Sequence, residues 1–125
     1  MAAQDQERIQ ESRLDRLLAL AGPAGAAELL ERLATDLARV DGALTAAVAA
    51  EDRAAVRSET HVLISVAGAA GALGLAEDAR RLNTAAHDDK APLPPALMQD
   101  ITRDLRALQG LIAARAARRT SSEGG

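Results

Sequence analysis

Apolar residues recur at three- and four-residue spacing along most of this chain. The longest series with this spacing consists of Leu30, Leu33, Leu37, Val40, Leu44 and Val48. An α-helix turns by about 100° per residue, so residues at this spacing form one stripe along its surface. The chain has no Phe, Tyr or Trp, so its core must consist of Leu, Val, Ile and Ala, and the many alanines favour close helix packing over strands. We therefore expect an all-α fold.

The same spacing divides the chain into one short helix and four longer ones. The short helix covers about residues 14–21 and is expected to end at Gly22-Pro23, because proline disfavours helix at the preceding residue. The first of the longer helices is expected to cover residues 24–50, and the next follows a corner at 50–53. The third is expected over residues 75–87, and the last begins after Pro94 and Pro95. Such an order predicts an antiparallel up-and-down four-helix bundle with a short N-terminal capping helix.

Local signals refine these boundaries. Asp52 can accept hydrogen bonds from the first free N–H groups of the helix that follows it. Three glycines, Gly68, Gly71 and Gly74, indicate a break or a close crossing after that helix. The last helix should bury the stripe Leu97, Ile101, Leu105, Leu108 and Ile112.

The length and composition of the chain indicate one domain. At 125 residues and 48% hydrophobic content it can build one core, and it is too short for two domains of ordinary size. We expect an N-terminal arm, partly disordered, over residues 1–12, a helical bundle over 13–114, and a disordered tail over 115–125. In this interpretation Arg115, Arg118 and Arg119 belong to a solvated tail.

Charge and residue types exclude several classes of function. A net charge of −3 and the absence of aromatic residues argue against nucleic acid as the main partner. Without cysteine there is no disulfide, thiolate metal site or thiol nucleophile. The polar N-terminus is unlike a signal peptide, and no apolar run is long enough to span a bilayer. We expect a cytoplasmic protein that binds no membrane.

One histidine, His61, has a distinctive position on the third expected helix. The stripe Val56, Thr60, Leu63 and Ala67 should face the core, which places His61 roughly 130° away from it, on the solvent side. Its neighbours on that face are Arg57, Ile64, Ser65 and Gly68. Because Ser65 and Gly68 are small, a second macromolecule could approach the imidazole closely.

The chain has a long helix, a corner, and then a helix with His61, which is followed by Gly71 and Leu75. This order resembles the histidine-containing phosphotransfer (HPt) domain of two-component phosphorelays. The preceding segment, RLDRLLALAGPAGAAELLERLATDLARVDGALTAAVAAEDRAAVRSETH, is also similar to the way this family approaches its histidine. The resemblance covers roughly residues 13–113.

Two positions depart from the family pattern. The family usually has lysine three residues after the histidine and glycine four residues after it, where this chain has Ile64 and Ser65. The lysine is thought to attract phosphoryl oxygens, so Ile64 removes a cation. Ser65 is small, and its hydroxyl could donate to a phosphoryl oxygen. Arg57, one turn before His61, could supply the missing charge, which is our interpretation and not a family rule.

The resemblance implies a phosphoryl carrier. His61 would accept phosphate from an aspartate of one receiver domain and pass it to another. The expected partners are response-regulator receiver domains or a hybrid histidine kinase, with Ile64 and Gly68 on the docking face. Because Mg²⁺ would be bound by the receiver, we expect this protein to have no cofactor or metal of its own. We also expect it to be a monomer without kinase or hydrolase activity.

Other interpretations compete with this one. A degenerate HPt-like module would dock a kinase or receiver without accepting phosphate, and Ile64 favours it. His61 could also be a solvated surface histidine with no role. His87 precedes Asp88 at a helix end, where an imidazolium favours the helix dipole, so we assign it a capping role. A lipid-surface bundle is weaker, because the chain is acidic and lacks Trp.

Overall fold

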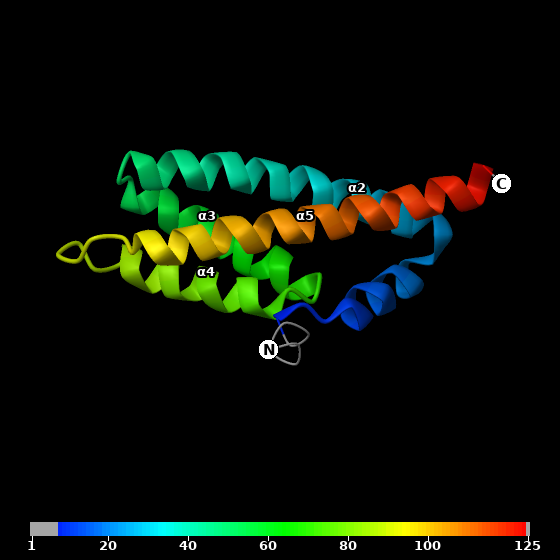
Figure 1. Cartoon of the computed structure of the whole chain (residues 1–125), viewed down its shortest axis with the longest axis horizontal. Helices are drawn as coiled ribbons and strands as arrows, with labels where there is room; N and C mark the ends of the chain where they lie inside the picture. The colour runs from blue at the N-terminus through cyan, green and yellow to red at the C-terminus, as the bar shows by residue number, and fades with distance from the viewer. Residues whose placement is uncertain (1–7, 125) are drawn as a thin grey trace.

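The structure is a computed structural model that describes residues 8–124. This part of the chain contains four helices and no strand: α2 (Glu11–Ala49), α3 (Arg53–Ala69), α4 (Leu73–Ala86) and α5 (Pro95–Gly124). Figure 1 shows the helices side by side along the long axis of the molecule. The predicted all-α fold is confirmed, and the arrangement agrees with a four-helix bundle.

Helix α2 consists of two segments that meet at Gly22. This glycine has φ 77° and ψ 171°, which is not helical, and Pro23 follows it. In Figure 1 the two segments meet at a sharp bend at one end of the molecule. The break falls at the predicted glycine–proline pair. It turns the first segment back along the molecule, so that Leu14 and Leu18 reach the same core as the second segment.

The corner before α3 also follows the prediction. Residues 50–52 connect α2 to α3, and Glu51 adopts φ 54° there. Asp52 is the N-cap residue of α3, because its Oδ1 accepts a hydrogen bond from the backbone N–H of Ala55 at 3.1 Å. The cap satisfies one of the N–H groups that a helix start leaves unpaired.

The core is aliphatic and is filled from all four helices. The predicted stripe of α5 is buried, except that Leu97 is only partly buried. The largest fully buried side chains are Leu14, Leu30, Leu37, Leu44, Leu63, Leu75, Leu82, Ile101, Leu105, Leu108, Ile112 and Val40. Close packing of these side chains is the main favourable contribution to folding.

Helix α5 continues ten residues beyond the end of the bundle that we predicted at residue 114. It reaches Gly124, and the Arg115 side chain is only 11% exposed. Arg115 Nη2 donates to Glu11 Oε1 at 2.8 Å, and its Nε donates to Asp15 Oδ1 at 2.9 Å. Arg115 is therefore not a solvated tail residue, because it joins α5 to the first segment of α2.

The chain before α2 lies against α4 and α5. We call residues 8–10 the N-terminal strap; the rest of the predicted arm, residues 1–7, lies outside the described residues. Arg8 Nη2 donates to Asp78 Oδ2 of α4 at 2.7 Å and also to Asp104 of α5. The strap thus connects three parts of the fold that are distant in sequence.

None of the helices in the described part of the chain combines the length and the apolar character needed to cross a membrane.

Candidate functional site

The orientation of α3 about its own axis places His61 on the surface. Its buried residues are Val56, Thr60, Leu63 and Ala67, which is the predicted stripe. Four residues at helical spacing bury one side of a helix, so the opposite side must face solvent. His61 is exposed on that side, as predicted.

A hydrogen-bond network between α3 and α4 maintains this orientation. Thr60 is fully buried, and its hydroxyl donates to the carbonyl oxygen of Val56 at 2.7 Å. The side-chain amide of Asn83 in α4 donates to Thr60 Oγ1 at 2.9 Å and to the carbonyl oxygen of Arg57 at 3.2 Å. Because both acceptors lie within four residues of His61, the network positions the backbone that presents the imidazole.

Two arginines of α3 bind the C-terminal end of α4. Arg53 donates to the carbonyl oxygens of Ala85 at 3.1 Å and Asp88 at 2.8 Å, and it also contacts Ala91 O. Arg57 Nη1 donates to the carbonyl oxygen of Ala86 at 3.1 Å. The last carbonyl groups of a helix have no partners within the helix and carry partial negative charge, so cations stabilise this end.

Arg57 was expected to lie beside a phosphoryl group, and in the structure its side chain binds the C-terminal end of α4. Its guanidinium is half-buried and oriented toward α4 by the bond to Ala86 O. An arginine has five N–H donors, so this bond leaves donors for another acceptor. The role beside His61 stays a prediction.

Several of the side chains next to His61 on the exposed face of α3 are small. Ser58 and Ser65, one turn before and after it, are both exposed. Gly68 is half-buried, and a Cβ added to it would meet no atom within 4 Å. Ile64, in the position where the family has lysine, is half-buried and packs against the core. His61 is therefore the largest exposed polar side chain between Arg57 and Gly68.

Gly71 and Gly74 have a different role from Gly68. Gly71 adopts φ 83°, and a Cβ there would collide with the carbonyl oxygen of Gln10. A Cβ at Gly74 would lie 2.7 Å from the guanidinium carbon of Arg8. Both glycines make room for the N-terminal strap, while the space above Gly68 is open.

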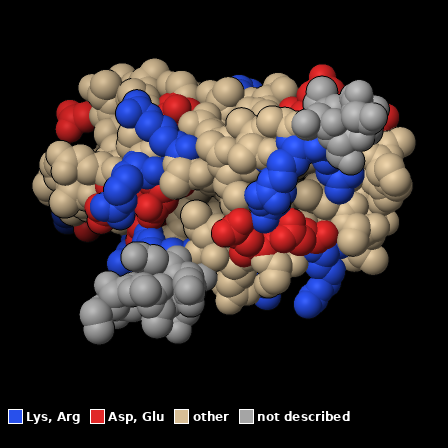
Figure 2. Space-filling view, turned by 45° about the vertical axis from the view of Figure 1, so that its right-hand side comes forward, with Lys and Arg blue, Asp and Glu red and all other residues tan. Residues whose placement is uncertain are grey.

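The ion pairs around the strap are partly shielded from solvent. Asp78 has a side chain that is 7% exposed, and Asp104 one that is 17% exposed. Hydrogen bonds to Asp104 and then to Asp78 raise the pKa of Arg8 above its ordinary value, although burial opposes them. For Arg115, burial lowers the pKa, but hydrogen bonds to Asp15 and Glu11 outweigh it and the net shift is upward. Figure 2 shows acidic and basic side chains next to one another on one face.

Other parts of the described chain have fewer features that could bind a ligand or take part in a reaction. Hollows of 340 Å³ and 640 Å³ lie between α2 and α5, and no residue of α3 lines them. Within residues 8–124 no group of three or more His, Asp or Glu side chains could bind a metal ion. The second histidine, His87, is the exposed C-cap residue of α4, which is the position we predicted for it.

The exposed imidazole of His61 is thus the side chain on this face that can act as a nucleophile. A neutral ring nitrogen can attack an electrophile such as an activated phosphorus, if a partner delivers it. The surrounding small residues leave space for that partner. Arg57 and Ser65 lie one turn away from His61 and could donate hydrogen bonds to oxygens of a transferred group.

The hydrogen bonds that position α3 were not predicted from the sequence. Thr60 was expected in the buried stripe, and a buried hydroxyl needs a hydrogen-bond partner. That requirement is a signal for a polar partner on a neighbouring helix, and in the structure the partner is Asn83 of α4. Neither the strap contacts of Arg8 nor the pairing of Arg115 had a comparable signal, because both join segments about 70 to 100 residues apart.

Comparisons of this chain with protein-family profiles, with curated proteins and with solved structures found no match.

Proposed function

We propose that this protein is a histidine phosphotransfer protein that relays a phosphoryl group between receiver-domain aspartates through phospho-His61. The observation that best supports the proposal is the exposure of His61 on a face of α3 where the adjacent side chains are small. The resemblance of the order His61, Gly71 and Leu75 to the HPt pattern supports it independently of this exposure.

The proposed architecture is an antiparallel up-and-down four-helix bundle capped by the first segment of α2. Short connections of three residues follow both α2 and α3, which favours reversal of direction at each corner. Salt bridges from Arg115 to Glu11 and Asp15 would attach the capping segment to the bundle. This architecture leaves one face of α3 free for a visiting domain.

In the proposed step, a lone pair of the neutral His61 imidazole attacks the phosphorus of an aspartyl phosphate. A nitrogen–phosphorus bond forms, the acyl phosphate oxygen–phosphorus bond breaks, and the aspartate leaves as a carboxylate. The other ring nitrogen keeps its proton or releases it to water. Transfer to the next aspartate is the same step in reverse, so no oxidant or other co-reactant is required.

Most of the catalytic effect in phosphoryl transfer comes from positioning and from neutralising charge. The partner receiver would supply Mg²⁺, and this protein would supply a fixed imidazole. Arg57 and Ser65 are the proposed hydrogen-bond donors to the phosphoryl oxygens. The protein would act as a cytoplasmic monomer with no kinase or hydrolase activity of its own.

The test is transfer from receiver domains that have been phosphorylated beforehand with acetyl phosphate. Incubation with a cognate receiver should label this protein at a group that is labile in acid and stable in base. The label should be lost in His61→Gln and kept in His87→Gln, which removes the other exposed histidine. If a broad panel of phosphorylated receivers labels neither the wild type nor His87→Gln, the proposal is wrong.

A second function is favoured by Ile64, which replaces the usual lysine with an apolar side chain. In this alternative the protein docks a receiver or kinase but accepts no phosphate. His61→Ala would then preserve both partner binding and signalling. Loss of signalling without loss of binding would exclude the alternative and support phosphotransfer.

A further inference from the structure

A shallow hollow of about 270 Å³, open to solvent, lies between the first segment of α2 and the C-terminal end of α3, and we call it the Gly68 hollow. It is lined by Arg13, Arg16, Leu17, Leu20, Gly68 and Ala69. Leu20 is 81% exposed, and no other large hydrophobic side chain within residues 8–119 is as open to solvent. Most of the other large apolar side chains of the described residues are buried in the core or packed against it.

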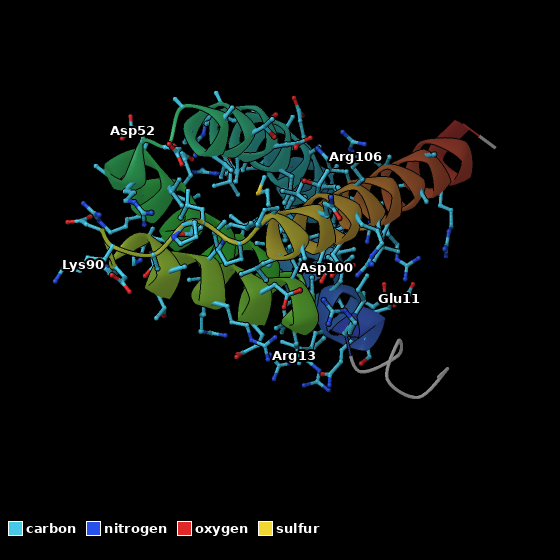
Figure 3. The ribbon with its side chains drawn as sticks, turned by 60° about the vertical axis from the view of Figure 1, so that its left-hand side comes forward. Glu11, Arg13, Asp52, Lys90, Asp100 and Arg106 are labelled. Atoms are coloured by element: carbon cyan, nitrogen blue, oxygen red, sulfur yellow. The ribbon has the colours of Figure 1, made fainter. Side chains whose placement is uncertain are left out.

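The charges of this segment are segregated. Its acidic residues Glu11 and Asp15 pair with Arg115 of α5. Its arginines Arg13 and Arg16 are exposed and have no hydrogen bond or ion pair of their side chains within residues 8–119. Figure 3 shows Glu11 and Arg13 on different sides of the segment. Two arginines that lack a side-chain partner within residues 8–119 therefore border the Gly68 hollow.

The Gly68 hollow lies on the same side of α3 as the proposed phosphoacceptor. Gly68 follows His61 by seven residues, which is a rise of about 10 Å and a rotation of only about 20° along a helix. A typical partner buries about 800 Å² on each protein, equivalent to a disc of about 16 Å radius. A domain centred near His61 would therefore extend over the hollow.

We infer that the Gly68 hollow, with Arg13 and Arg16, is the docking site for the acidic phosphorylation face of a receiver domain. The inference rests on the proposed function. An aspartyl phosphate that binds Mg²⁺ is surrounded by further carboxylates, since Mg²⁺ prefers oxygen ligands of this kind. The two exposed guanidinium groups of Arg13 and Arg16 complement such a face and favour encounter with it. Leu17 and Leu20 would provide the apolar centre that stable interfaces contain.

The test separates docking from chemistry with two variants and a control. The double variant Arg13→Glu/Arg16→Glu reverses the charge, and Leu20→Ser removes the exposed apolar side chain. Arg106→Glu is the matched control, because Arg106 is exposed on α5, lacks a side-chain partner within residues 8–119, and lies away from the hollow (Figure 3). Binding to receiver domains phosphorylated with acetyl phosphate is measured by fluorescence anisotropy, and labelling of His61 by phosphoramidate, which needs no docking, is measured separately.

The inference predicts weaker receiver binding, by about tenfold or more, in both hollow variants, with the control changed by less than about twofold. Labelling by phosphoramidate should equal that of the wild type, and circular dichroism is used separately to check that the variants are folded. Wild-type affinity in both hollow variants would overturn the inference while the proposed function stands. Receiver binding that depends on the hollow without any labelling of His61 would support docking and contradict phosphotransfer.

A membrane is the other surface that arginines and an exposed leucine could contact. Sedimentation with vesicles of phosphatidylglycerol and phosphatidylcholine tests this possibility directly. If the wild type binds the vesicles, the hollow variants do not, and receiver affinity is the same in all, the inference is wrong. Receiver affinity that is lost in the hollow variants, with no sedimentation of the wild type, supports it.

Discussion

The backbone N–H of Gln10 donates a hydrogen bond to the carbonyl oxygen of Gly71 at 2.8 Å. The contact joins the N-terminal strap to the connection between α3 and α4, next to the end of the helix that contains His61. Figure 1 shows the beginning of the described chain beside this connection. Gly71 is one of the residues on which the HPt resemblance depends, and the structure gives it a packing role.

Replacing Gly71 with alanine should destabilise the protein by about 2 kcal/mol or more, because an L-residue at φ 83° is strained and its Cβ would collide with Gln10 O. Urea denaturation followed by circular dichroism measures the change. Gly42→Ala is the control: Gly42 is exposed inside α2, and a Cβ there meets nothing within 4 Å. That variant should be more stable by about 0.5–1 kcal/mol. Equal stability of the two variants would contradict this role of Gly71.

The order of helices and the exposed position of His61 could be predicted because both follow from local patterns. Helical spacing identifies the buried stripe of each helix, and Asp52 and the Gly22-Pro23 pair mark boundaries. These signals lie within a few residues of the feature that they predict. The orientation of α3, and hence the exposure of His61, required only the positions of Val56, Thr60, Leu63 and Ala67.

Contacts between distant segments could not be predicted in this way. Arg8 reaches Asp78 and Asp104, and no periodicity relates these positions. The length of α5 was underestimated because few apolar residues follow residue 114, whereas Arg115 binds the first segment of α2 through ion pairs. Helix propensity also contributes, since alanine and arginine, which are common there, are strong helix formers.

Replacing Arg8 with lysine should make stability depend on alkaline pH. A cation whose folded-state pKa is raised stabilises the fold at every pH below its unfolded pKa, and this contribution is lost as the pH rises through the folded value. For Arg8, whose pKa is raised by its hydrogen bonds to Asp104 and Asp78, the loss begins only in strong alkali. For lysine it begins above about pH 10.4.

The urea midpoints of the wild type and Arg8→Lys are compared at pH 8 and pH 11 to test this expectation. The chain has no Tyr or Cys, and Lys90 is common to both proteins, so other titrations cancel in the difference. The deficit of the variant should grow between the two pH values. A constant deficit would show that the charge at position 8 does not stabilise the fold.

The pair of Thr60 and Asn83 should be energetically coupled. Thr60→Val removes the acceptor of the Asn83 amide, and Asn83→Ala removes both of its hydrogen bonds to α3. We expect each single variant to lose about 1 kcal/mol and the double variant to lose less than the sum. A double-mutant cycle in urea measures the coupling. Strict additivity would mean that the two side chains do not stabilise each other.

Restoring a cation at position 64 should accelerate phosphorylation of His61. Ile64 lies one turn after His61 and is half-buried at the edge of the core, so a lysine there can extend its ammonium group to solvent on the same face. A charge-assisted hydrogen bond to the phosphoryl group corresponds to a rate increase of about tenfold or more. The initial rate of labelling by phosphoramidate is compared between the wild type, Ile64→Lys and the neutral Ile64→Gln, after circular dichroism shows that all three are folded. Only the lysine variant should be faster, and equal rates for lysine and glutamine would mean that charge at this position has no effect on transfer.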